Sequence, residues 1–369
     1  MEGETQRIAR LTPLPEVLSR IDAMVGAVAP RRIAPARAAG HVLAEDVIEA
    51  TAVPAGARAL RDGFAVTADV ISDASSYAAI LLTASRRVQV GEALPDGADA
   101  IAPLDIIVER DGQFAAIASV APGDGVLSAG ADIGAGTMLG RAGSLVRAAD
   151  AAALAAAGIA EVVVRAPRIC VAAARPGHDA VVAAAVELIA SAVAAAGGIG
   201  RRSTGDLATA LADKDADAII VVGGSGPGRN DASVRALTAA GRVEVHGVAL
   251  TPGETAGFGM TDQRPVLIAP GRLDAALAVW LTLGRQMLAR LAGRTEELVG
   301  STVVLTRKHA SPLGLSEVVP VRASGGKAES IASSYWPLRV MVEANGWILV
   351  PADSEGYPVG AEVVLRPWL

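Results

Sequence analysis

Residues 217–231 constrain the fold more than any other stretch of this chain. An unbroken apolar run from Ala218 to Val222 leads into a glycine-rich turn from Gly223 to Gly228, and the acids Asp217 and Asp231 stand at the two ends. A short apolar run that leads into glycines predicts a buried parallel strand. In an open α/β sheet, the loop after such a strand lies at the carboxyl edge, where ligands bind.

The turn and its flanking acids allow two interpretations. Glycines let backbone N–H groups approach an anion closely, and the start of the following helix adds a positive dipole. A tight strand-to-helix turn without a ligand would have the same composition. Because two acids flank a turn that otherwise suits anions, we expect a metal-assisted anion site with Asp217 and Asp231 as its metal ligands.

From about residue 167 to residue 295, apolar strands alternate with helical patterns. This alternation predicts a doubly wound α/β domain with a parallel sheet, in which residues 180–196 form a helix and Val243 to Leu250 form one strand. Loops at 175–179, 223–231 and 270–274 follow strands and should meet at one sheet edge. They would gather acids that suit Mg²⁺ and arginines that suit an oxyanion: Asp179, Asp217, Asp231, Asp274, Arg175, Arg229 and Arg272. Each aspartate could instead cap a helix.

The 369 residues are enough for about two to four domains. Residues 61–120 contain several short β-like runs between polar turns. The C-terminal part, from about residue 298, contains apolar runs that predict antiparallel strands of a small β-barrel or sandwich: Ser301–Thr306, Val318–Val321, Trp347–Val350 and Glu362–Leu365.

Composition argues against several classes of protein. The net charge of −6 and the isoelectric point of about 5.4 argue against a broad nucleic-acid surface. The longest apolar window, residues 180–196, carries Glu187, so we expect a buried helix and no membrane segment. The N-terminus lacks the apolar core of a signal peptide, and the single cysteine, Cys170, fits a reducing compartment. We therefore expect a cytoplasmic protein.

Several motifs occur in the order in which one known family has them. They are Arg61-Asp62-Gly63-Phe64-Ala65, residues Leu94–Ala100 and Gly130–Gly134, the stretch Asp217–Asp231, Thr251–Thr255 followed by Phe258-Gly259, and Ala344-Asn345-Gly346. On these motifs the chain resembles the molybdopterin molybdenumtransferase (MoeA-like) family, whose members insert molybdate into adenylylated molybdopterin. The match extends over nearly the whole length of the chain.

The resemblance implies a homodimer of multidomain subunits. Each subunit would have a discontinuous linker and dimerisation domain, an inserted β-rich domain, an α/β molybdopterin-binding domain and a C-terminal β domain. Their expected bounds are residues 1–45 with 121–166, residues 46–120, residues 167–297 and residues 298–369. The cleft would lie between the α/β domain of one subunit and the inserted domain of the other, so that Asp62 approaches the 223–231 loop across the dimer.

The resemblance also implies roles for individual residues. The expected catalytic residues are Asp62, Asp179, Asp217 and Asp231, of which Asp217 and Asp231 would also hold Mg²⁺. The expected ligand-binding residues are Gly223, Gly224, Ser225, Gly226, Gly228, Arg175, Pro270, Gly271 and Arg272. Molybdopterin, its adenylylated form and molybdate are the expected ligands, and other cofactor-biosynthesis proteins or an apo-molybdoenzyme are the expected partners.

The chain departs from the family pattern around the molybdate region. Val90 replaces a threonine, and Asp179 stands in the place of a glutamate. Two lysines of a Lys-Pro-Gly-Lys-Pro loop are replaced by Thr251 and Glu254, and Arg272 stands in the family's Pro-Gly-Asn-Pro loop. Loss of two cations and gain of an acid should weaken binding of a dianion. Nearby arginines could compensate, because a guanidinium binds oxyanions well.

Three functions fit this pattern. The first is an active transferase that takes up molybdate and releases AMP and the finished cofactor. The second is a non-catalytic paralogue that binds molybdopterin or the finished cofactor as a carrier or maturation factor. The third is an enzyme that acts on a related pterin or nucleotide.

Overall fold

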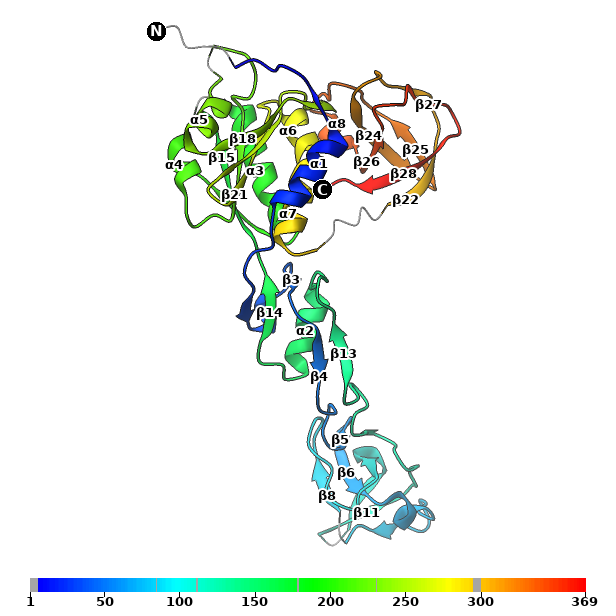
Figure 1. The fold of residues 1–369 in the computed structure, drawn as a ribbon. Helices are drawn as coiled ribbons and strands as arrows, with labels where there is room; N and C mark the ends of the chain where they lie inside the picture. Colours follow the sequence, from blue (N-terminus) through cyan, green and yellow to red (C-terminus); the bar gives the residue numbers. More distant parts are fainter. Residues whose placement is uncertain (1–5, 84, 111, 178, 230, 295–299) are drawn as a thin grey trace. The chain divides into compact units, whose positions relative to one another are not determined.

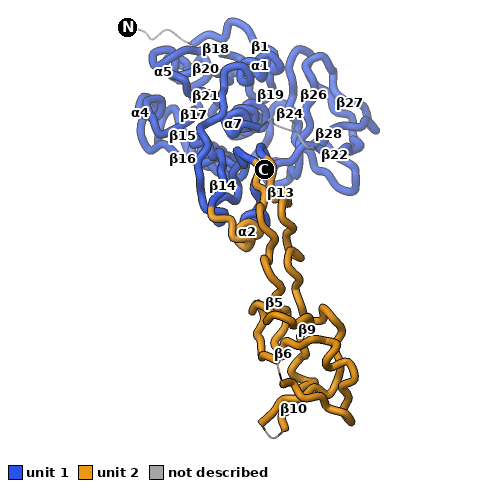
Figure 2. The backbone as a smooth tube through the Cα atoms, turned by 60° about the horizontal axis from the view of Figure 1, so that its bottom comes forward, with its two compact units in different colours: residues 1–45, 142–151, 161–369 blue, residues 46–141, 152–160 orange. Residues whose placement is uncertain are grey.

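A computed structural model describes residues 6–83, 85–110, 112–177, 179–229, 231–294 and 300–369. The chain divides into two compact units, shown in different colours in Figure 2. Unit 1 comprises residues 1–45, 142–151 and 161–369, and unit 2 comprises residues 46–141 and 152–160. The four predicted domains are a finer division, and their bounds stay a prediction.

A six-stranded sheet forms the centre of the α/β part of unit 1 (Figure 1). In spatial order its strands are β16 (Ile199–Arg202), β15 (Arg168–Ala173), β17 (Ala218–Val222), β21 (Arg264–Ala269), β20 (Gly257–Thr261) and β18 (Arg242–His246). The first four strands are parallel, and β20 and β18 are antiparallel to their neighbours. The carboxyl ends of β15, β17 and β21 therefore lie side by side at one edge.

Helices cover both faces of this sheet, because its central strands present alternate apolar side chains to opposite sides. On β17, Ile220 and Val222 belong to one buried cluster, and Ile219 and Val221 belong to another. The first cluster includes residues of α1 (Leu14–Met24), α3 (Ala180–Ala195), α6 (Leu273–Val279) and α7 (Arg285–Leu291), and the second includes residues of α4 (Leu207–Ala212) and α5 (Ser233–Ala240). The predicted doubly wound fold and its long helix near 180–196 are confirmed.

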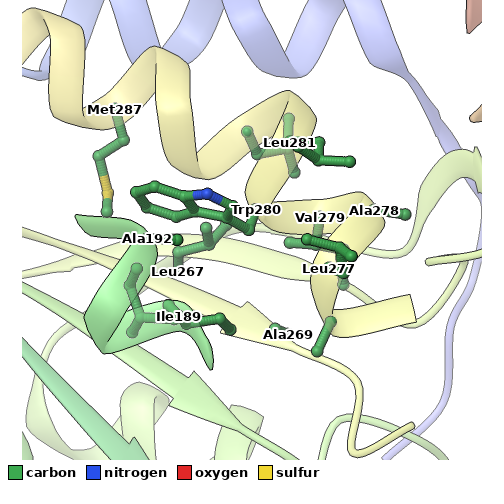
Figure 3. Packing of buried hydrophobic residues seen from close by; sticks show 14 of the residues in the cluster. Ile189, Ala192, Leu267, Ala269, Leu277, Ala278, Val279, Trp280, Leu281 and Met287 are labelled. Atoms are coloured by element: carbon green, nitrogen blue, oxygen red, sulfur yellow. The ribbon is translucent and has the colours of Figure 1, made fainter. Parts of the chain in front are cut away.

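A large aromatic side chain fills the space behind the sheet. Trp280 begins a π-helical turn, Trp280–Gly284, between α6 and α7, and it is only 2% exposed. Figure 3 shows its ring among Ile189 and Ala192 of α3, Leu267 of β21 and Met287 of α7. Burial of a side chain of this size supplies much packing free energy to one small area, and so holds the sheet and its helices in fixed positions.

The structure corrects one predicted strand. The run from Val243 to Leu250 is two strands, β18 and β19 (Val248–Thr251), separated by Gly247. Gly247 has a φ of +96°, and a Cβ atom there would lie 2.4 Å from Ile8 Cγ2. Only glycine fits this bend, so β19 leaves the sheet of β18 and pairs with a different one. Strand β20 was not predicted from the sequence.

The C-terminal part of unit 1 is a closed five-stranded barrel. Its strands are β24 (Ser316–Ser324), β25 (Lys327–Ser330), β22 (Ser301–Leu305), β28 (Glu362–Pro367) and β26 (Gly346–Val350), and β26 pairs back with β24 to close it. The helix α8 (Val340–Glu343) and the short pair β23 (His309–Ala310) and β27 (Gly356–Tyr357) complete this part. β19 joins β1 (Thr12–Pro13) to β24, so a continuous sheet links the α/β part to the barrel.

Unit 2 is built from short strands, as predicted. Its three-stranded sheets are β8 (Arg86–Val88), β6 (Gly63–Val66) and β9 (Ala100–Pro103), and β10 (Ile107–Arg110), β11 (Gln113–Ala116) and β7 (Ile80–Leu81). Two-stranded pairs are β12 (Val126–Leu127) with β5 (Arg58–Ala59), and β13 (Thr137–Gly140) with β4 (Val47–Glu49). Unit 1 also contains the sheet of β2 (Arg31–Ile33), β14 (Val162–Arg165) and β3 (Val42–Leu43). Helix α2 (Ala148–Ala156) begins in unit 1 and ends in unit 2.

Gly63 in unit 2 has no room for a side chain. A Cβ atom there would lie 2.3 Å from the carbonyl oxygen of Ala102, which is backbone of the paired strand. We therefore expect Gly63→Ala to destabilise unit 2 by roughly 1–3 kcal/mol, because the strand must shift. Thermal unfolding followed by circular dichroism measures this. Gly56→Ala is the control, since nothing lies within 4 Å of its Cβ position, and an equal effect of both variants would contradict the explanation.

Candidate functional site

The glycine loop, residues 223–231, leaves the carboxyl end of β17 in the centre of the sheet. Gly223 donates its N–H to the carbonyl of Ala269, at the end of β21, with an N···O distance of 2.9 Å. A Cβ atom on Gly271 would lie 3.4 Å from the Cα atom of Gly223, so the turn after β21 runs directly beside the loop. The loops at 223–231 and 270–274 therefore lie next to each other, as predicted.

Contacts within the described part of the glycine loop hold its ends and its first turn in place. Asp231 accepts a hydrogen bond at Oδ2 from the N–H of Gly228 (3.0 Å), and its own N–H donates to the carbonyl of Gly228 (3.0 Å). Ser233 donates its hydroxyl to the carbonyl of Gly223 (2.8 Å). A Cβ atom on Gly224, whose φ is +64°, would lie 2.6 Å from the Oγ of Ser233. Glycine at 224 is thus required both by conformation and by space.

Gln6, in the N-terminal segment, forms hydrogen bonds with the loop and was not predicted from the sequence. Gln6 is 6% exposed and donates from Nε2 to the carbonyls of Gly224 (3.0 Å) and Gly226 (2.9 Å). Its Oε1 accepts from the N–H groups of Val234 (2.9 Å) and Arg235 (3.1 Å) in the first turn of α5. No motif marks Gln6, and 218 residues separate it from Gly224, so no local pattern could have predicted these contacts.

Two further side chains hold the loop. His246, at the end of β18, lies with Nε2 2.9 Å from the carbonyl oxygen of Ser225. Because a carbonyl only accepts, Nε2 must carry the proton in this contact. The hydroxyl of Ser225 lies 2.7 Å from that of Thr255. Thr255 belongs to the loop that departs from the family's lysine pattern, so that loop is fastened directly to the glycine loop.

The structure contradicts the prediction that Asp217 and Asp231 hold one metal ion. Asp217 precedes β17 and Asp231 follows it, so a five-residue strand of about 3.3 Å per residue separates the two ends. Asp217 accepts at Oδ2 from the backbone N–H of Arg168 (2.7 Å) and pairs with the guanidinium of Arg168 at the amino edge of the sheet. It holds β15 and β17 together there, and is not at the glycine loop.

The predicted acid Asp179 caps a helix. Its Oδ1 accepts from the N–H groups of Val181 (2.7 Å) and Val182 (3.4 Å) at the start of α3. At the start of α5, the N-cap residue Ala232 has no side chain that can accept a hydrogen bond. The Oε1 of Gln6 accepts from the N–H of Val234 there instead. A role of Asp179 in catalysis stays a prediction. Residue His178 of the same loop lies outside the described residues.

Arg272 is held by a buried carboxylate. Its Nε and Nη2 bind Asp274 at 3.0 and 2.5 Å, and Asp274 is 3% exposed. Asp274 also accepts from the backbone N–H of Trp336 (3.0 Å), and the ring of Tyr335 lies 5.1 Å from the guanidinium carbon of Arg272. Hydrogen bonding to Asp274 raises the pKa of Arg272, and the charge of Glu254 adds to this. Arg272, Asp274 and Glu254 together therefore contribute one positive and two negative charges.

Two further arginines, Arg175 and Arg229, lie in loops at the carboxyl edge of the sheet. Within the described residues, Arg175 and Arg229 are exposed and have no ion-pair partner. Both lie in loops that follow β15 and β17. They are better placed to meet an anion than Arg272, whose fork is already occupied by Asp274. Their predicted compensation for the missing lysines stays open.

Asp62 lies in unit 2, directly before β6. Its Oδ1 accepts from the backbone N–H of Val90 at 2.9 Å. Val90 is itself one of the departures from the family pattern and is 63% exposed. The glycine loop belongs to unit 1, so the predicted approach of Asp62 to that loop stays a prediction.

The described residues contain no cluster of three or more His, Cys, Asp or Glu side chains that could hold a metal ion. Mg²⁺ commonly binds through one or two carboxylates together with phosphates of a substrate. Asp231 is the carboxylate of the glycine loop, and it is bound to Gly228 here. The described residues therefore supply no preformed cage for Mg²⁺. Burial raises the pKa of the Cys170 thiol, which lies on β15.

Three family models match the chain in order and cover most of it. Residues 12–158 match the MoeA N-terminal region (domain I and II), residues 201–290 match a model described as "Probable molybdopterin binding domain", and residues 302–368 match the MoeA C-terminal region (domain IV). The chain belongs to the MoeA family. The glycine loop and the turn that carries Arg272 both fall within the molybdopterin-binding match.

Relatives of this MoeA protein match it over nearly its whole length. Molybdopterin molybdenumtransferase 2 of Mycobacterium tuberculosis is 27% identical over 400 residues, which cover 94% of this chain and 96% of the relative. Molybdopterin molybdenumtransferase 1 of the same organism is 27% identical over 416 residues, with the same coverage. This MoeA protein is a homologue of these transferases.

Solved structures show the same fold. The molybdopterin biosynthesis MoeA protein from Pyrococcus horikoshii has a TM-score of 0.71 and 24% identity, over 98% of this chain and 100% of that one. A molybdenum cofactor biosynthesis protein from Pyrococcus furiosus has a TM-score of 0.61 and 21% identity, over 97% and 100%. The predicted fold class, with its α/β domain and C-terminal barrel, is confirmed. Within the described part of the chain, every helix is too short or too polar to cross a membrane.

Proposed function

We propose that this MoeA protein acts in molybdenum cofactor biosynthesis by inserting molybdate into adenylylated molybdopterin, with release of AMP. The observation that carries the proposal is the glycine loop, held at the carboxyl edge of β17 within the molybdopterin-binding match. A loop in this position, with exposed Arg175 and Arg229 on neighbouring turns, suits a phosphorylated ligand.

Roles of individual residues follow from this proposal. The N–H groups of the glycine loop would bind phosphate oxygens, and Arg175 and Arg229 would neutralise their charge. Asp231 would keep the loop closed or contribute a carboxylate to Mg²⁺ that arrives with the substrate phosphates. Mg²⁺ would neutralise the charge of the leaving phosphate when bound. A homodimer in which Asp62 completes the site, and transfer of the product to an apo-molybdoenzyme in the cytoplasm, belong to the same proposal.

One observation favours the second candidate, a carrier of molybdopterin or of the finished cofactor. Glu254 and the Asp274-bound Arg272 occupy the region where the family's lysines and Pro-Gly-Asn-Pro loop stand. An excess of negative charge there opposes a molybdate dianion. The pterin would still bind at the glycine loop, which does not depend on those residues.

A molybdate-insertion assay separates the two functions. Purified protein is incubated anaerobically with adenylylated molybdopterin, Mg²⁺ and molybdate, and AMP release is followed. We expect molybdate-dependent AMP release that falls about tenfold or more in Asp231→Asn, because the loop loses its closing carboxylate. Asp215→Asn, an exposed acid at the other edge of the sheet, is the matched control.

The outcomes lead to different conclusions. Release that responds to Asp231 but not to Asp215 supports the transferase. Binding of adenylylated molybdopterin without AMP release would contradict the transferase and leave the carrier. Absence of both binding and release would contradict both functions.

A further inference from the structure

We propose that Gln6 is a positioning residue for the ligand-binding backbone of the glycine loop, with His246 as its counterpart. Together they form hydrogen bonds to the loop carbonyls of Gly224, Ser225 and Gly226. The N–H groups of Ser225 and Gly226 are thereby left to face a phosphate oxygen of the ligand. This inference rests on the proposed binding of a phosphorylated pterin at the loop. It adds two residues to which neither the motifs nor the family matches assign a role.

Gln6 uses its complete hydrogen-bonding capacity on this loop and the helix after it. A glutamine amide has two N–H donors and two acceptor positions. The donors bind the carbonyls of Gly224 and Gly226, and the oxygen accepts from Val234 and Arg235. Because carbonyls only accept and backbone N–H groups only donate, the amide can face only one way. No other side chain of this length provides both the two N–H donors and the acceptor oxygen that these four hydrogen bonds need.

The direction of each carbonyl fixes the direction of the next N–H group. In a trans peptide, the carbonyl of one residue and the N–H of the following residue point to opposite sides. With the Gly224 carbonyl bound to Gln6, the N–H of Ser225 points away from the N-terminal segment. With the Ser225 carbonyl bound to His246, the N–H of Gly226 points away from that ring.

These N–H groups have no protein partner among the residues that the structure describes. Ser225 is only 3% exposed, and an N–H group of a buried residue costs free energy unless something accepts from it. Successive N–H groups turned outward from a glycine-rich turn form an anion-binding concavity. The ligand chemistry that fits is a phosphate monoester or diester oxygen.

The same contacts exclude another position for the anion. From the sequence, the start of the helix after the loop was expected to add a positive dipole at the anion site. Gln6 already accepts from Val234 and Arg235 in that first turn. The loop backbone, and not the helix start, is therefore the part that is available to a phosphate.

Two variants of Gln6 test the proposal in the full-length protein. Gln6→Glu has the same shape and keeps an acceptor for Val234 and Arg235, but it places an oxygen against the carbonyls of Gly224 and Gly226. Gln6→Met has nearly the same length and no charge, and it removes both the N–H donors and the acceptor oxygen. Gln263→Glu makes the same charge change at an exposed turn at the far end of β21 and is the matched control.

The readout is the dissociation constant for adenylylated molybdopterin, measured anaerobically by fluorescence titration, together with the binding stoichiometry. We expect both Gln6 variants to bind at least about tenfold more weakly than the wild type, with unchanged stoichiometry, as for the loss of a charge-assisted hydrogen bond. Misfolded protein would lower the binding stoichiometry, so an unchanged stoichiometry shows that the weaker binding comes from the folded protein. Gln263→Glu should bind as the wild type does.

Failure of this inference differs from failure of the proposed function. If the wild type does not bind adenylylated molybdopterin, the proposed function is wrong. If the wild type binds and both Gln6 variants bind equally well, the positioning role is overturned. Weakened binding in Gln6→Glu alone would assign the effect to charge and would also overturn it.

Discussion

Glu254→Lys is expected to strengthen molybdate binding by at least about tenfold. Glu254 acts electrostatically on Arg272, and its loop is fastened to the glycine loop through Thr255 and Ser225. The substitution changes the local charge by two units beside a site proposed for a dianion. It also restores one of the two lysines that the family pattern has. The KM for molybdate in the AMP-release assay, or equilibrium dialysis with labelled molybdate, measures the effect.

Two controls make this result interpretable. Glu254→Gln removes the charge without reversing it and should give a smaller gain, about threefold. Asp215→Lys makes the same two-unit change at the amino edge of the sheet, far from the loop, and should change molybdate affinity little. Equal affinities of the wild type and Glu254→Lys would contradict the electrostatic account of the molybdate region.

Glu317→Ala is expected to destabilise the C-terminal barrel by about 3–5 kcal/mol. Glu317 is fully buried and accepts hydrogen bonds from the Nε2 of His309 (3.0 Å), the hydroxyl of Ser333 (2.6 Å) and the N–H of Ser334 (3.0 Å). Its removal leaves the Nε2 of the buried His309 without this acceptor, whereas the exposed Ser333 and Ser334 can bind water instead. Chemical denaturation of the full chain, followed by tryptophan fluorescence, measures the loss. Glu362→Ala, an exposed acid on β28 of the same barrel, is the control and should cost under about 0.5 kcal/mol.

The contribution of Glu317 should also depend on pH. Burial by itself would raise the pKa of its carboxyl, but hydrogen bonds from His309, Ser333 and the backbone of Ser334 outweigh burial and lower the pKa below the ordinary 4.5. A lowered folded-state pKa means that the stabilisation is complete above pH 4.5 and is lost as the pH falls below it. The stability difference between wild type and Glu317→Ala should therefore narrow below that pH. A constant difference would contradict this cause.

Much of the fold could be predicted because local patterns determine it. The apolar run that became β17 and the long apolar stretch that became α3 each carry enough local signal to specify one element. The split of Val243–Leu250 could not be predicted, because it depends on the close approach of Ile8 to Gly247 from the other end of the sequence. Packing between distant segments overrode the apolar pattern there.

The site was only partly predictable for the same reason. The glycine loop and its neighbour at Gly271 follow from the general rule for carboxyl ends of parallel strands. Asp217 was assigned to the loop because it is near in sequence, but a strand carries its two ends to opposite edges of the sheet. Gln6 and His246 were missed because their contacts with the loop join distant parts of the chain.

The most direct test of the account is a crystal structure of this MoeA protein with adenylylated molybdopterin. We predict phosphate oxygens within about 3 Å of the backbone nitrogens of Ser225 and Gly226, with Gln6 still bound to the carbonyls of Gly224 and Gly226. A ligand ordered elsewhere on the protein, with no phosphate at the glycine loop, would contradict the central claim that this loop binds the pterin substrate.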